Sequence, residues 1–92
     1  MIHETVRIAD PLGVHALVAQ DLASIAARYQ SSLYLRHEGR TASLHRPIEL
    51  LALGIPSAAE ASVWADGIDE RPALAAVVTA LCTPTTPPKS HT

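Results

Sequence analysis

The sequence is poor in the features that mark several protein classes. Its only cysteine, Cys82, cannot form a disulfide within the chain, and no spacing of cysteine and histidine resembles a zinc site. A formal net charge of -2 provides no basic field for nucleic acid. No segment reaches the ~20 apolar residues of a membrane span, and the first residues do not resemble a signal peptide. We therefore expect a cytoplasmic protein without metal, nucleic-acid partner or membrane insertion.

The 92 residues allow one small domain, because a chain of this length buries only about 60–65% of its unfolded surface in a single core. Residues 1–82 contain the apolar patterns from which a core can form. Residues 83–92 are rich in Pro and Thr and contain no core-forming residue. We expect a domain over 1–82 and a disordered tail over 83–92.

The apolar residues recur with two periods, which predict strands and helices in alternation. Period two predicts strands over 2–8, 32–36, 40–44 and 60–65, the middle two joined by a hairpin at Glu38-Gly39. Helical spacing predicts a helix from Ala16 to about Tyr29, a short helix opening at Pro47, and a helix capped by Asp69 that ends near Cys82. The order βαββαβα predicts an α+β open-faced β-sandwich, with a four-stranded antiparallel sheet and three helices on one face.

His15 stands at the cap position of the first predicted helix, where the backbone N–H groups of Ala16, Leu17 and Val18 have no partners within the helix. The helix dipole favours an anion at this end and disfavours an imidazolium, so we expect a neutral ring. A neutral imidazole can attack phosphorus, and the free N–H groups can then hold the phosphoryl oxygens. The alternative is that His15 is a simple cap or turn residue with a solvated ring.

The stretch GVHALVAQ at 13–20 resembles the active-site pattern of the HPr family, the histidine-containing phosphocarrier proteins of the bacterial phosphoenolpyruvate-dependent sugar phosphotransferase system. That pattern runs Gly, an aliphatic residue, His, any residue, Arg, Pro, Ala, Ala. The similarity extends from the first strand to about Cys82. Further matches are Glu38-Gly39 at the hairpin turn, Leu53-Gly54 after the short helix, and Asp66-Gly67 with Asp69 and Glu70 before the last helix.

The resemblance implies an HPr-like sandwich in which His15 takes a phosphoryl group from Enzyme I on Nδ1 and passes it to sugar-specific or regulatory phosphotransferase proteins. The amides of Ala16 and Leu17 would bind the phosphate. The protein would then be a monomeric, stoichiometric carrier without a cofactor rather than a turnover enzyme.

The sequence departs from the family pattern at two positions beside the histidine. Leu17 replaces the arginine that pairs with the phosphoryl group, and Val18 replaces the following proline. We expect slower phosphotransfer as a result. The alternatives are a regulatory module that keeps the fold and binds a protein without carrying phosphate, and a carrier whose partner brings its own cation.

The surface around His15 is a candidate docking site for partner proteins. Leu17 lies off the apolar stripe of its helix, and Ile48 and Leu51 lie on the short helix, where they are either docking residues or core contacts. Arg46 occupies the place of the serine that is phosphorylated in many family members, so control through that serine is not expected. Whether Arg46 reaches the histidine or is simply solvated is left open by the sequence.

Overall fold

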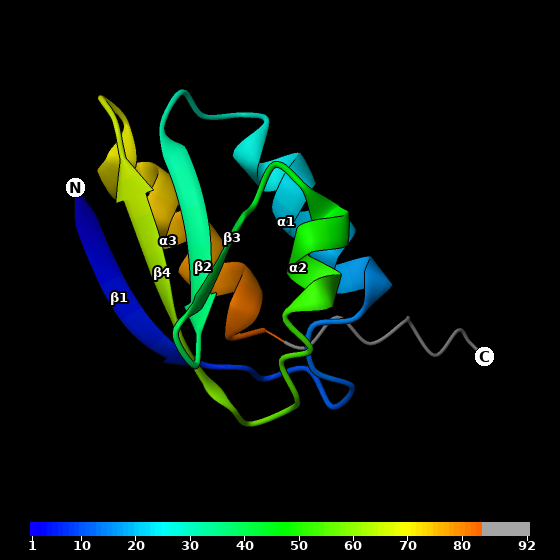
Figure 1. Ribbon diagram of the computed structural model, residues 1–92. Coiled ribbons are helices and arrows are strands. Elements are labelled where there is room, and N and C mark those ends of the chain that lie inside the picture. Colours follow the sequence, from blue (N-terminus) through cyan, green and yellow to red (C-terminus); the bar gives the residue numbers. More distant parts are fainter. Residues whose placement is uncertain (84–92) are drawn as a thin grey trace.

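The computed structural model describes residues 1–83, which form a four-stranded antiparallel sheet with three helices on one face (Figure 1). Of the expected tail at 83–92, residues 84–92 lie outside the described residues. The strands are adjacent in the order β1-β4-β2-β3. The elements are β1 (Ile2–Arg7), α1 (Ala16–Ala26), β2 (Ser32–His37), β3 (Arg40–Ser43), α2 (Pro47–Ala52), β4 (Glu60–Asp66) and α3 (Glu70–Leu81). The predicted fold is confirmed.

The core lies between the sheet and the helices, because alternate strand residues and one stripe of each long helix face the same space. Helix α3 packs on β1, β4 and β2, while α1 packs against both α3 and α2. The strand residues buried there include Leu33, Leu35, Ala61, Val63 and Ala65, and the helix residues include Val18, Leu22, Leu74, Val77 and Leu81. The apolar periodicity of the sequence therefore corresponds to one continuous core.

Helix α1 ends earlier than its apolar spacing predicts, at Ala26 instead of near Tyr29. The next amides, those of Arg28 and Tyr29, donate to carbonyls three residues back, which tightens the last turn and ends the helix. Tyr29 still packs against the core, so it follows the stripe although it is not helical. Cys82, the C-cap residue of α3, is exposed.

The β2–β3 hairpin turns at Glu38 and Gly39, as predicted. Both residues have positive φ, +50° and +80°, as a type I′ turn requires. Glycine adopts this conformation at little cost, whereas a glutamate at positive φ is uncommon. The turn is therefore formed with one residue poorly suited to it.

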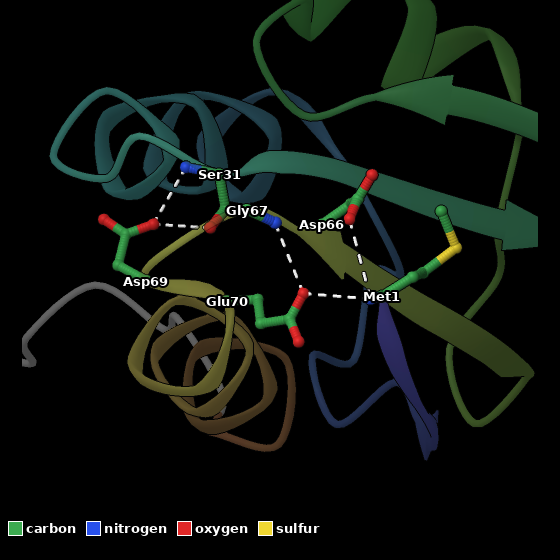
Figure 2. A network of polar contacts seen from close by, with 6 residues as sticks. All are labelled: Met1, Ser31, Asp66, Gly67, Asp69 and Glu70. Atoms are coloured by element: carbon green, nitrogen blue, oxygen red, sulfur yellow. Dashed lines mark hydrogen bonds and ion pairs between the residues drawn. The ribbon is translucent and has the colours of Figure 1, made fainter.

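The start of α3 is joined to the loop that follows α1 by the side chain of Asp69 (Figure 2). Asp69 occupies the expected cap position, but its carboxylate makes no capping hydrogen bond. It accepts instead from the backbone amides of Gln30 and Ser31 and from the Ser31 hydroxyl. The Ser31 hydroxyl, followed by these amides, lowers the pKa of Asp69. The residue expected to cap α3 thus connects two segments that are distant in the sequence.

The loop from β1 to α1 is fixed by a close approach of two backbones. Gly13 has φ of +73°, and a Cβ atom there would lie 2.3 Å from the carbonyl oxygen of Ile55. The next amide, of Val14, donates to that same oxygen at 2.9 Å. Only glycine fits here, and the contact sets where α1 begins.

Candidate functional site

His15 is the N-cap residue of α1, at the position where the sequence predicts a helix start. Its backbone is extended, with φ of -100° and ψ of -174°, and its carbonyl accepts the first helical hydrogen bond, from the Ala19 amide at 2.9 Å. Its side chain is 24% exposed, and Nδ1 lies 3.4 Å from the donating Leu17 amide. The ring therefore lies at the positive end of the helix and is open to an approaching group.

The other ring nitrogen of His15 faces a buried carboxylate, which sequence reasoning missed as a functional group. Nε2 of His15 lies 3.1 Å from Oδ1 of Asp10, and Asp10 is only 3% exposed. The same oxygen accepts from the Leu12 amide at 2.9 Å, and the Asp10 carbonyl accepts from the Gly13 amide at 3.0 Å. The sequence Asp-Pro-Leu-Gly is typical of such a turn, but it does not indicate that the carboxylate reaches a histidine five residues later.

The two contacts of the His15 ring assign its tautomer. An ionised carboxylate can only accept, so the contact with Asp10 places the proton on Nε2. The Leu17 amide can only donate, so it requires a lone pair on Nδ1. A ring with both contacts is the neutral Nε2–H form, in which the lone pair of Nδ1 points toward the Leu17 amide.

Apolar side chains are exposed on α1, on α2 and in the loop before His15. Leu17 of α1 is 51% exposed, and on α2 Ile48 is 81% and Leu51 is 39% exposed. This exposure favours the docking surface over the core-contact alternative for Ile48 and Leu51. Leu12, in the loop before His15, is 76% exposed and was not singled out from the sequence.

Arg46 caps α2 by position, and its guanidinium lies 3.6 Å from the carboxylate of Glu49. Its side chain is largely exposed. This contact within α2 agrees with the solvated alternative for Arg46 rather than with a cation that reaches His15.

Two other histidines, His3 and His37, have structural contacts of their own. His3 stacks on Trp64, and Nδ1 of His37 lies 3.0 Å from the Glu60 carbonyl oxygen. Among residues 1–83, no three side chains of His, Cys, Asp or Glu come together as metal ligands would. None of the helices in this part of the chain is long and apolar enough to cross a membrane.

Residues 2–82 match the family model described as "PTS HPr component phosphorylation site". The chain belongs to the HPr family. It is 41% identical over 71 residues to the Phosphocarrier protein HPr of Mycoplasma genitalium, a match that covers 76% of this chain and 81% of the relative.

Two solved HPr structures have the same fold as this chain. HPr-C-His from Thermoanaerobacter tengcongensis aligns with a TM-score of 0.84 and 22% identity, over 88% of this chain and 91% of that one. The histidine-containing phosphocarrier protein of Mycoplasma aligns with a TM-score of 0.79 and 27% identity, over 87% and 97%. The family predicted from GVHALVAQ is thus confirmed for a chain with Leu and Val in place of the HPr arginine and proline.

Proposed function

We propose that this HPr-family chain carries a phosphoryl group on Nδ1 of His15, which it receives from Enzyme I and passes to a sugar-specific or regulatory phosphotransferase protein. The observation that carries the proposal is the ring itself, which caps α1 with the Nδ1 lone pair beside the Leu17 amide. In the transfer, this lone pair forms the N–P bond while the bond from phosphorus to the donor breaks. The Nε2 proton stays in place, so the ring becomes an imidazolium.

The amides of Ala16 and Leu17 bind the phosphate in this proposal. They belong to the first turn of α1, whose N–H groups and dipole favour an anion. The Leu17 amide, which faces the Nδ1 lone pair before the transfer, is placed to donate to a phosphoryl oxygen afterwards. Because the family arginine is replaced by Leu17, these amides bear more of the phosphoryl charge than they do with a guanidinium present.

Partners dock on the apolar surface formed by Leu17, Ile48 and Leu51 in this proposal. These side chains lie on α1 and α2, which pack together, and all three are exposed. An apolar surface beside an accessible nucleophile suits a carrier that meets several partner proteins in turn. The protein acts as a monomeric, stoichiometric carrier in the cytoplasm, without a cofactor.

A second candidate function is a regulatory module that binds a protein partner without carrying phosphate. The replacement of the arginine and proline by Leu17 and Val18 favours it, because a module that holds no phosphate has no use for the cation. The docking surface would serve either function.

Phosphorylation by Enzyme I distinguishes the two functions. The protein is incubated with labelled phosphoenolpyruvate and the host's Enzyme I, and acid-labile phosphate is measured. We expect label in the wild type and in His45→Ala, a matched control at an exposed histidine, and none in His15→Ala. A wild type that binds Enzyme I or another phosphotransferase protein but takes up no label would support the binding module instead.

A further inference from the structure

We propose that Asp10 is a positioning residue for phosphotransfer, which holds His15 as the Nε2–H tautomer and balances the positive charge that the ring acquires. The inference rests on the proposed function, because it assigns the group that acts through His15. It starts from the short contact between the Asp10 carboxylate and Nε2 of the ring.

Asp10 is held more firmly than a surface carboxylate would be. It is 3% exposed, and its backbone and side chain both take part in the turn before α1, through the amides of Gly13 and Leu12. The ring is fixed between this carboxylate and the Leu17 amide, because a flip of the ring would put carbon atoms where its two nitrogens lie and break both contacts. Asp10 therefore decides which nitrogen has the lone pair.

The charge of Asp10 matters once the ring is phosphorylated. The unphosphorylated ring is neutral, but once the N–P bond has formed with the Nε2 proton retained, the ring is a cation. A buried carboxylate 3.1 Å from Nε2 stabilises that cation, as the aspartate of a Ser-His-Asp triad stabilises its imidazolium. The family arginine stabilises the phosphoryl anion, whereas Asp10 stabilises the other half of the same dipolar product. The chain thus keeps electrostatic help at the ring although it lacks the guanidinium.

The first part of the proposal, that Asp10 holds the Nε2–H tautomer, can be tested on the His15 ring before any phosphate is added. The measurement is NMR of protein with ¹⁵N-labelled histidine. We expect the wild-type His15 to show a proton bonded to Nε2 that exchanges slowly with water, and an unprotonated Nδ1. In Asp10→Ala this proton should exchange freely and its signal should vanish. In Asp10→Asn it should persist, because an amide oxygen can still accept from both Nε2 and the Leu12 amide.

Kinetics with Enzyme I test the second part. We expect the rate of phosphorylation at saturating carrier to fall about tenfold in Asp10→Asn, which keeps the hydrogen bond but loses the negative charge, and about a hundredfold in Asp10→Ala, which loses both. The carrier concentration that gives half the maximal rate should stay the same, since these substitutions do not change the docking surface. Glu4→Gln, which removes an exposed carboxylate of β1, is the matched charge control and should change neither quantity.

Several outcomes would overturn the proposal. One is a wild-type ring with its proton on Nδ1, and another is an Asp10→Asn protein that is phosphorylated at the wild-type rate. A variant that fails to fold is recognised by its thermal unfolding, and Asp10→Asn then decides the question because it keeps both acceptor contacts. If Enzyme I does not phosphorylate the wild type, the proposed function fails. The ¹⁵N NMR spectrum of the His15 ring still decides whether Asp10 sets the tautomer.

Discussion

The departure from the family pattern that bears most on the phosphoryl group is Leu17, which stands where HPr proteins have the arginine that pairs with this group. Leu17 is half exposed at the start of α1, so a longer side chain has room there. We expect Leu17→Arg to raise the rate of phosphorylation about ten- to a hundredfold, because a charge-assisted contact contributes about 1.5–3 kcal/mol. The measurement is the initial rate of label uptake from Enzyme I.

Leu17→Gln is the control for this change, because it removes the apolar side chain and adds length without charge. It should not accelerate the transfer. If Leu17→Gln gained as much as Leu17→Arg, loss of the apolar surface and not the cation would be the cause. If both variants were slower, Leu17 would be serving as a docking residue whose loss outweighs the charge.

Gly13 is the second residue on which the site depends. Its φ of +73° disfavours any side chain, and a Cβ atom would lie 2.3 Å from the Ile55 carbonyl oxygen, a backbone atom that cannot easily move. We expect Gly13→Ala to lower the free energy of unfolding by at least about 2 kcal/mol. Urea denaturation measures the change.

Gly39 provides the comparison for Gly13, because its φ is also positive, +80°, but its surroundings are open. Apart from its two chain neighbours, no atom of residues 1–83 lies within 4 Å of the place that a Cβ atom would take. Gly39→Ala should cost only the conformational part, about 1 kcal/mol. Equal losses at Gly13 and Gly39 would show that the approach to Ile55 contributes nothing.

Among the elements, the β2–β3 hairpin is the one whose sequence suits its conformation least. Glu38 has φ of +50° at the first central position of the turn, where asparagine is preferred. We expect Glu38→Asn to raise the free energy of unfolding by about 0.5–1 kcal/mol, because asparagine adopts this conformation more readily. The midpoint of urea denaturation should rise. An unchanged or lower midpoint would mean that Glu38 makes a compensating contact.

The elements were predictable because each has one apolar face, and periodicity follows from burial. Their ends were less predictable where tertiary contacts decide, as at α1, which stops at Ala26 although its stripe continues to Tyr29. Asp69 shows the same limit. Its residue type and position predict a cap, but the loop after α1 offers its carboxylate better donors than the helix does.

Within the candidate site, sequence reasoning could place His15 at a helix start because that depends only on local order along the chain. It could not find the contact with Asp10, because several turn geometries are open to Asp-Pro-Leu-Gly and only one of them brings the carboxylate to Nε2. Pattern alone also left Ile48 and Leu51 undecided, since a helix of six residues is too short to define its buried face.

Over the whole molecule, α1 connects two polar sites at its opposite ends. Its first turn begins at His15, and the loop that follows its last turn is bound by Asp69 at the start of α3 (Figures 1 and 2). The N-terminal amine of Met1 lies near this second site, 3.1 Å from the Glu70 carboxylate, and Glu70 also accepts from the Gly67 amide. The Met1 amine, Asp69 and Glu70 at this site have pKa values that differ from their ordinary values.

Acid should loosen this second site while the core remains packed. The pKa of Asp69 is lowered from 3.8, mainly by the Ser31 hydroxyl, and that of Glu70 is lowered from 4.5, mainly by the N-terminal amine. The folded protein thus binds fewer protons than the unfolded chain in this range, so both groups contribute stability above these values that is lost as pH falls through the folded pKa values. The amine, whose pKa is raised from 8.0 mainly by Glu70, contributes below that pH and loses its effect in alkali.

Ser31→Ala tests this assignment, because it removes the hydroxyl that lowers the pKa of Asp69 most. We expect the free energy of unfolding, measured in urea from pH 3 to pH 7, to depend less steeply on pH between 3 and 5 than in the wild type. Asp69→Asn should flatten the same region further, because no proton is then taken up at this position. Asp21→Asn, at an exposed residue of α1, should leave the slope unchanged. A wild-type slope in Ser31→Ala would place the acid sensitivity in other carboxylates.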